Sequence, residues 1–414
     1  MQALKTLGQW VTFAALIGVA AGCASALFLW LLDLATTFRE AHPALIVALP
    51  FAGVAIGLFY QRFGQPIRGG NNLVIDTIHD QGPQLPLRMA PMVLVGTVLT
   101  HLFGGSAGRE GTAVQMGAGL ADALAHRLAP EVRRALIAAG VAGGFGSVFG
   151  TPIAGAVFGL EFVTLGRIEY RALVPVTVAA LVGDLTTRAL GITHAYYRAP
   201  AHLSLDLLLL GKWCLFAIAV ALVTVAFIEL THALKALGER QLPNLPARMF
   251  AGGALVTLLW LALGTSDYLG LGVPTIVRAF EQPVPSYAFL AKLVFTAVTL
   301  GAGFLGGEVT PLFFVGATLG ATLAPWLGLP QDLAAGVGMA AVFATAANTP
   351  LALSVMAVEL LGANLFPHVV IVSVLAYVLT GHRSIYPAQR VLHDKRGEAL
   401  STPTPLRELN KPPS

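Results

Sequence analysis

The chain has 414 residues, of which 56% are hydrophobic and 11% are charged, and its net charge is +4. Soluble domains carry about 25% charged residues, so this composition excludes a chain that covers itself with a water-facing surface. A mean hydropathy of +0.75 instead predicts a polytopic protein whose solvent is the bilayer.

Apolar runs follow one another almost without interruption after residues 1–10, which we interpret as a cytoplasmic N-terminus. Several runs are shorter than the ~20 residues that span a bilayer, and runs broken by Gly or Pro are typical of discontinuous helices. The polar, Pro-rich segment 381–414 is interpreted as a cytoplasmic tail without a regulatory domain. The expected helices cover 11–34, 44–60, 88–104, 113–126, 134–146, 152–165, 172–191, 206–234, 247–265, 287–303, 311–326, 332–346, 350–362 and 366–380.

An internal repeat relates the two halves of the chain at a constant offset of 198 residues. It divides the chain into a first membrane repeat (11–191), a linker (192–205) and a second membrane repeat (206–380). Duplicated halves usually place the substrate site at their interface. The number of crossings in each half, which decides whether the repeats are inverted, stays open at this point. The matches are Glu110-Gly111-Thr112 with Glu308-Val309-Thr310, Thr151-Pro152 with Thr349-Pro350, and Glu161 with Glu359.

The segment from Gly104 to Thr112 places one Arg and one Glu among four glycines, between two apolar runs. Glycines expose consecutive backbone N–H groups, and a helix that begins here adds its positive dipole end, which together make an anion site. A carboxylate from Glu110 can occupy that site when charged and leave it when protonated. The alternative is a surface loop in which Glu110 pairs with Arg109, but the repeat and the flanking apolar runs favour a gate that couples proton and anion movement.

The equivalent segment of the second half, Gly306 to Pro311, again combines a turn, a carboxylate and a helix start. Glu308 either faces solvent or pairs with a cation such as Arg109. The Thr310 hydroxyl is suited to donate to an anion or to relay a proton, and simple capping of the helix by Thr310 is compatible with both roles.

Two further groups of residues are candidates for a functional role, and each also has a purely structural interpretation. Gly69-Gly70-Asn71-Asn72 precedes an apolar-periodic segment, where amide groups at a helix start coordinate a small anion, although the same letters also describe an ordinary turn. Glu161 and Glu359 lie in apolar segments, where an ionisable residue is a functional candidate, although both are also compatible with solvated helix ends.

No catalytic arrangement or nucleotide-binding loop is recognisable, so the sequence predicts neither an enzyme nor a cofactor. The two cysteines, Cys23 and Cys214, have no metal-ligand spacing, and we expect no metal. Lys and Arg gather in short connecting segments and at the C-terminus, which indicates cytoplasmic loops rather than a nucleic-acid surface.

Taken together, these motifs resemble the CLC family of anion channels and anion/proton exchangers. Gly108-Arg109-Glu110-Gly111 is similar to its gating-glutamate motif, and Gly307-Glu308-Val309-Thr310-Pro311 to its second anion motif. Gly70-Asn71-Asn72 stands where the family has its Gly-Ser-Gly loop, and Tyr386 roughly matches a C-terminal tyrosine near the anion. The resemblance covers about residues 11–390, and the order of the motifs is more specific than any one of them.

The departures from that pattern resemble the fluoride-exporting branch of the family. Asn71 replaces the coordinating Ser, Thr112 the usual Pro, and Val309 the usual Phe. Phe162 aligns with the internal proton glutamate of many exchangers, and Glu161 precedes it. Fluoride is small and strongly hydrated, so its site needs several good donors, which Asn amides, a Thr hydroxyl and backbone N–H groups supply.

The resemblance implies an all-α fold of two inverted repeats with many short, tilted and discontinuous helices. It implies a fluoride/proton antiporter with Glu110 as gate and with Glu308, Thr310 or Glu161 as candidates for the proton path. A chloride/proton exchanger or a passive anion channel is the alternative within the family, and an intramembrane enzyme is disfavoured. The expected partners are fluoride or chloride, protons, the lipid bilayer and a second copy of the chain, in a bacterial inner membrane with cytoplasmic termini.

Overall fold

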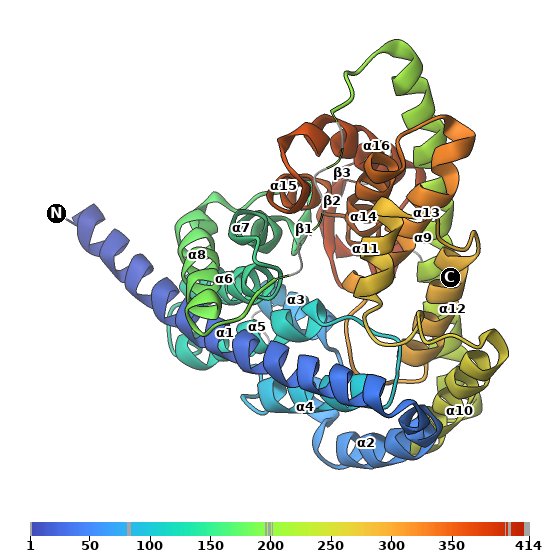
Figure 1. Cartoon of the computed structure of the whole chain (residues 1–414). Helices are drawn as coiled ribbons and strands as arrows, with labels where there is room; N and C mark the ends of the chain where they lie inside the picture. Colours follow the sequence, from blue (N-terminus) through green and yellow to red (C-terminus); the bar gives the residue numbers. More distant parts are fainter. Residues whose placement is uncertain are drawn as a thin grey trace.

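The computed structural model describes residues 2–80, 84–194, 197, 200, 202–393, 395 and 399–409. Within these residues the chain is almost entirely helical, which confirms the expected all-α class (Figure 1). Seven of the described helices are long and apolar enough to cross a membrane. The proposed linker 192–205 and the end of the polar tail lie partly outside the described residues.

Within the described residues, the two halves each contribute eight α-helices. Those of the first half are α1 (Gln2–Ala41), α2 (Leu49–Phe63), α3 (Asn71–Asp80), α4 (Met89–Leu102), α5 (Glu110–Ala125), α6 (Pro130–Phe149), α7 (Pro152–Glu161) and α8 (Leu173–Ala189). Those of the second half are α9 (Leu207–Gln241), α10 (Leu245–Leu263), α11 (Val273–Glu281), α12 (Ala288–Gly301), α13 (Val309–Leu327), α14 (Gln331–Ala347), α15 (Pro350–Leu361) and α16 (Phe366–Leu379).

Two short helices, α3 and α11, were not among the expected apolar runs. The reason is composition: α3 carries two Asn and two Asp in ten residues, and α11 carries Arg278 and Glu281 in nine. The long helices also exceed their predicted ends, since α1 runs to Ala41 and α9 to Gln241 through polar residues. Residues 2–10 continue α1 as helix.

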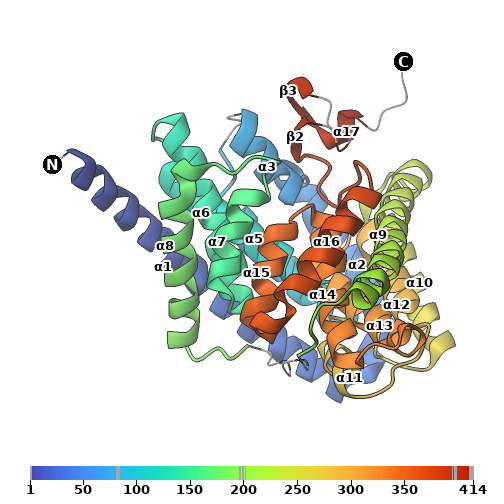
Figure 2. The same ribbon diagram turned by 90° about the horizontal axis from the view of Figure 1, so that it is seen from above.

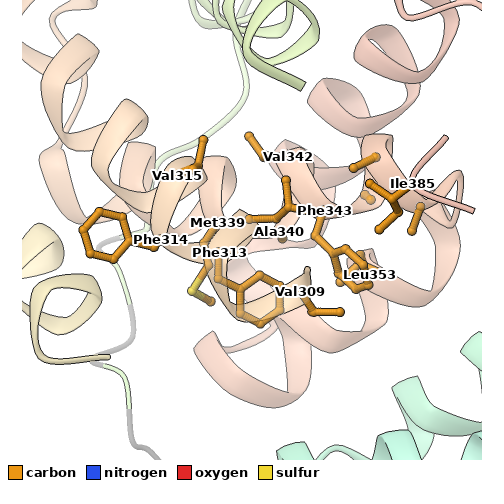
Figure 3. Packing of buried hydrophobic residues seen from close by; sticks show 14 of the residues in the cluster. Val309, Phe313, Phe314, Val315, Met339, Ala340, Val342, Phe343, Leu353 and Ile385 are labelled. Carbon is orange, nitrogen blue, oxygen red and sulfur yellow. The ribbon is translucent and has the colours of Figure 1, made fainter. Parts of the chain in front are cut away.

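The core depends on small residues where helix backbones meet. A Cβ on Gly117 of α5 would collide with the carbonyl of Gly140 in α6, and one on Gly316 of α13 would collide with that of Gly338 in α14. Close approach of backbones through small residues is the usual way to pack helices in lipid. Aromatic side chains fill the remaining space, as where Phe313 and Phe343 meet edge to face with ring centroids 5.8 Å apart (Figure 3).

The described part of the C-terminal tail folds back onto the helices. β2 (Arg390–His393) pairs in parallel with β1 (Thr164–Leu165), which follows α7, and antiparallel with β3 (Ala399–Pro405). The short α17 (Leu406–Leu409) follows, and β2, β3 and α17 lie on the same side of the molecule as α3 (Figure 2). The tail was predicted as an extension, and the pairing with β1, a partner far away in the sequence, is what gives it structure.

Candidate anion and proton site

Glu110 lies at the point where the two halves meet. It is the first residue of α5, and its side chain is completely buried. The Thr310 hydroxyl of α13 donates to its two carboxylate oxygens at 2.6 Å and 2.7 Å. The backbone N–H groups of Thr310 and Arg109 add bonds of 3.2 Å each. The carboxylate thus occupies the N-terminus of α13, where N–H groups and the helix dipole favour negative charge.

The two glycine-rich loops touch directly in front of this carboxylate. The N–H of Gly108 donates to the carbonyl of Gly307 at 2.6 Å, and the N–H of Gly307 returns a bond of 2.8 Å. A Cβ on Gly307 would lie 2.7 Å from the backbone nitrogen of Gly111, and one on Gly108 would lie 2.9 Å from the Gly307 carbonyl. Only glycine allows this approach, which brings the N-termini of α5 and α13 together.

The guanidinium of Arg109 lies beside the Glu110 carboxylate rather than beside Glu308. Its Nε is 3.4 Å from Glu110 Oε1, and the Arg109 side chain is 19% exposed. Glu308 instead lines two neighbouring cavities, a smaller one of about 420 Å³ and a larger one of about 660 Å³. Lys235 and Glu239, from one face of α9, line both cavities as well.

The smaller cavity gathers the remaining predicted anion residues. Gly70, Asn71 and Asn72 at the start of α3 line it together with Tyr386. The Asn71 amide nitrogen is the nearest neighbour of a Cβ built on Gly111, at 3.0 Å, which places this amide next to the glycine-rich segment that carries Glu110. The side-chain oxygen of Asn71, Oδ1, is buried and has no hydrogen-bond partner among the described residues.

Asn72 and Tyr386 are each held in place by a contact with another segment of the chain. Asn72 accepts a 3.0 Å hydrogen bond from the N–H of Ala388. The Tyr386 ring is buried and packs edge to face against Phe162, with centroids 4.9 Å apart. Tyr386 therefore faces the smaller cavity from the bend that follows α16 (residues 384–389), and Asn72 faces it from α3, tied to that bend through Ala388.

Val309 stands apart from the other predicted anion residues. Its side chain is buried in the apolar cluster that also holds Phe313 and Phe343 (Figure 3). Only its backbone, at the first position of α13, is suited to contact an anion.

Glu161 and Glu359 form a reciprocal pair of helix caps. Glu161, at the end of α7, accepts from the N–H groups of Leu351 and Ala352 in α15, at 3.2 Å and 2.8 Å. Glu359 of α15 accepts from the first N–H groups of α7 at 3.0 Å and 2.7 Å. Every partner is shifted by the same 198 residues as the sequence repeat. Glu161 lines neither the smaller nor the larger cavity.

Two polar residues of the smaller cavity, Thr97 and Gln115, were not named in the sequence analysis, and Thr112 was named as part of a motif without a role of its own. The hydroxyls of Thr97 in α4 and Thr112 in α5 bond to each other at 2.7 Å, and Gln115 follows one helical turn after Gly111. Their signal in the sequence was a set of uncharged polar residues inside apolar helices. Such residues are common in membrane helices, so only their convergence in space marks them.

The comparisons with known proteins show the family of the chain. The family model for voltage-gated chloride channels matches residues 52–381. A relative from Pseudomonas syringae pv. tomato, named chloride/fluoride channel protein, is 48% identical over 99% of this chain and 92% of its own length.

Two solved structures resemble the fold. The crystal structure of a CLC-type fluoride/proton antiporter matches 94% of this chain and 98% of its own with a TM-score of 0.90 at 38% identity. A slow cyanobacterial Cl⁻/H⁺ antiporter matches 90% of this chain and 94% of its own with a TM-score of 0.78 at 20% identity, which supports the fold alone. The chain belongs to the voltage-gated chloride channel family, also called the CLC family.

Proposed function

We propose that this protein is a fluoride/proton antiporter that exports fluoride from the cytoplasm. The observation that carries the proposal is the Glu110 carboxylate, which occupies the N-terminus of α13 and takes the Thr310 hydroxyl as donor. A carboxylate in that place stands in for an anion. The same donors are therefore available to fluoride only when the carboxylate has left.

Protonation supplies the reason for Glu110 to leave. The charged carboxylate is held by two N–H groups, one hydroxyl and the dipole of α13. A neutral carboxyl loses the attraction to the dipole, and one of its acceptor positions becomes an O–H donor. Fluoride then binds the Thr310 hydroxyl and backbone, while the proton travels on Glu110. One side chain thus exchanges a proton for an anion.

For the proton's route from the gate to the cytoplasm we favour Glu308 over Glu161. Glu308 directly precedes α13 and lines both cavities, so it lies between the gate and open space. Both carboxylate oxygens of Glu161 are used by backbone N–H groups of α15. Thr310 joins the route by contacting Glu110, and its hydroxyl is able both to donate and to accept.

Fluoride is favoured over chloride by the donors around the smaller cavity. Asn71, Asn72, Thr112 and Tyr386 offer amide and hydroxyl groups there, which replace the water of a small, strongly hydrated ion. The names of the relatives point both ways, since one is a chloride/fluoride channel protein and one a fluoride/proton antiporter. A chloride/proton exchanger or a passive anion channel is therefore the second candidate.

The same proposal includes the architecture and its setting. The reciprocal caps of α7 and α15 support a division into two equivalent repeats, 11–191 and 206–380. We further propose a homodimer in a bacterial inner membrane with both termini in the cytoplasm, as the basic connecting segments favour.

Liposomes loaded with fluoride test the function directly. Fluoride efflux is followed with an ion-selective electrode while proton uptake is recorded in the same sample. We expect stoichiometric proton uptake in the wild type, loss of proton uptake in Glu110→Gln, and no change in Glu169→Gln, an exposed carboxylate 56% accessible in its side chain. Proton uptake driven by fluoride in Glu110→Gln would contradict the gate. Equal efflux of chloride and fluoride would favour the second candidate.

A further inference from the structure

One fully buried side chain, Gln389, holds together the bend that carries Tyr386. Its amide nitrogen donates to the carbonyls of Phe162 at 3.0 Å and Ala347 at 2.8 Å. Its amide oxygen accepts from the Ser384 hydroxyl at 2.7 Å and from the Asn348 amide at 3.3 Å. Gln389 thereby uses both donors and both acceptor positions of its amide.

These four partners come from three separate parts of the fold. Phe162 follows the last residue of α7, and Ala347 and Asn348 end α14, where Asn348 takes the left-handed conformation with φ of 54°. Ser384 is the first residue of the bend that follows α16. A single amide therefore joins the ends of one helix from each half to the segment that reaches the smaller cavity.

Ser384 connects the Gln389 side chain to the backbone of Tyr386. The Ser384 oxygen accepts from the N–H of Tyr386 at 2.9 Å while its proton is donated to Gln389. A serine hydroxyl has one proton, and the Gln389 oxygen at 2.7 Å is a much closer acceptor for it than the Ala346 carbonyl at 3.4 Å, so the bond to Gln389 directs its lone pairs. The Tyr386 ring packs on Phe162, whose carbonyl is a partner of Gln389. Backbone and ring of Tyr386 are thus both set by the same amide.

The bend also reaches Asn72 on α3. The N–H of Ala388, the neighbour of Gln389, donates to the Asn72 side chain at 3.0 Å. Asn72 and Tyr386 both line the smaller cavity, so a shift of the bend moves two of its donors at once.

We propose that Gln389 is a positioning residue for the anion path: it acts through Ser384 on Tyr386 and through the bend on Asn72, and so sets how tightly fluoride binds in the smaller cavity. This inference rests on the proposed function, because it takes Tyr386 and Asn72 as fluoride contacts. Polar networks that are fully satisfied make a core rigid and unique, which suits a site that must hold a small ion.

Fluoride efflux as a function of internal fluoride separates positioning from mere stability. Gln389→Leu keeps most of the side-chain volume and removes all four bonds. We expect the fluoride concentration at half-maximal rate, KM, to rise about fivefold or more, with a maximal rate within about twofold of the wild type, as loss of ground-state binding predicts. Ser384→Ala keeps the two carbonyl bonds of Gln389 and should raise KM in the same direction by less.

Gln331 provides the matched control. Its amide nitrogen also donates to two carbonyls, those of Ala279 at 2.9 Å and Gln282 at 2.7 Å, but at the opposite end of α14. Gln331→Leu should lower thermal stability and leave KM unchanged. A rise of KM equal to that of Gln389→Leu would reduce Gln389 to a structural residue and overturn the proposal.

A Tyr386→Ala background decides whether Gln389 acts through the tyrosine. If it does, Gln389→Leu adds little to the KM of Tyr386→Ala, because coupled residues are not additive. Full additivity overturns the proposal. A wild-type KM in Gln389→Leu together with a raised KM in Tyr386→Ala overturns the positioning role and keeps the proposed function. A wild-type KM in Tyr386→Ala overturns the premise that Tyr386 contacts the anion, and the positioning role with it. If Gln389→Leu does not fold, Ser384→Ala is compared in its place.

Discussion

The close approach of Gly307 to the gate loop yields the sharpest prediction of the structure. In Gly307→Ala the new methyl group would lie 2.7 Å from the backbone nitrogen of Gly111 and 3.3 Å from its Cα. Ordinary contacts of this kind begin at 3.4 Å, so the N-termini of α5 and α13 must separate by about 0.7 Å. The neighbouring atoms are backbone, and no side-chain rotation relieves the contact.

A separation of that size is large for the gate. Glu110 and Thr310 are held across the same junction by bonds of 2.6 Å and 2.7 Å. Functional groups need to stay within about 0.5 Å of their working positions, and a 1 Å misplacement can cost about 100-fold in rate. We therefore expect fluoride flux to fall by about 10- to 100-fold. Overpacking of a core usually costs about 1–3 kcal/mol, so the folded protein should still be recovered.

The assay is fluoride efflux from liposomes, with purified protein checked for size and melting temperature. Gly211→Ala is the control, because a Cβ at that position in α9 meets no atom within 4 Å apart from its chain neighbours and the backbone of its own helix. It should transport at the wild-type rate. Wild-type flux in Gly307→Ala would show that the glycine bridge is not needed to align the gate, and the reasoning from contact distance would be refuted.

Three further predictions concern individual side chains. Thr310→Val should lower proton-coupled fluoride flux about tenfold or more, since hydrogen bonds to charged groups contribute about 1.5–3 kcal/mol. The control Thr318→Val loses only a bond to its own helix, and its fluoride flux should stay within about twofold of the wild type. Glu161→Gln and Glu359→Gln should lower the melting temperature by similar amounts and keep proton uptake, because both carboxylates cap a helix; loss of proton uptake in Glu161→Gln alone would restore it to the proton path. Burial lowers the pKa of Lys395 from 10.5 to about 7, so the unfolded chain binds more protons between these values and stability rises with pH there. Lys395→Met should lack that rise, measured as melting temperature between about pH 7 and about pH 9.

Much of the fold was predictable because helices that lie in a bilayer are recognisable from their apolar composition. Each of the fourteen expected apolar runs overlaps a described helix. The polar helices α3 and α11 were missed because a hydropathy pattern detects burial in lipid, and these two segments are buried mainly against protein. The pairing of the tail with β1 was equally out of reach, since two residues of strand after α7 carry no recognisable signal.

Glu110 illustrates how much a repeated motif predicts. Matched glutamates and glycines indicated that Glu110 and Thr310 belong to one site, and the structure places the hydroxyl at the carboxylate. The same reasoning treated Glu161 as a candidate for the proton path; its carboxylate accepts from N–H groups at the start of α15, and its part in proton transfer stays a prediction. Sequence spacing cannot distinguish a carboxylate that contacts Thr310 from one that caps α15, because both glutamates lie next to or within apolar segments.

By itself, the sequence determined the membrane class, the internal duplication and the residue types of the gate, because hydropathy, a constant offset and glycine-rich helix starts are local or periodic properties. The tertiary structure alone decided which partners these residues have: Glu110 with Thr310, Glu161 with α15, and Gln389 with the bend that carries Tyr386. The physical reason is that a hydrogen bond depends on position to within a few tenths of an ångström. Positions between segments about 200 residues apart are set only when the whole helix bundle packs.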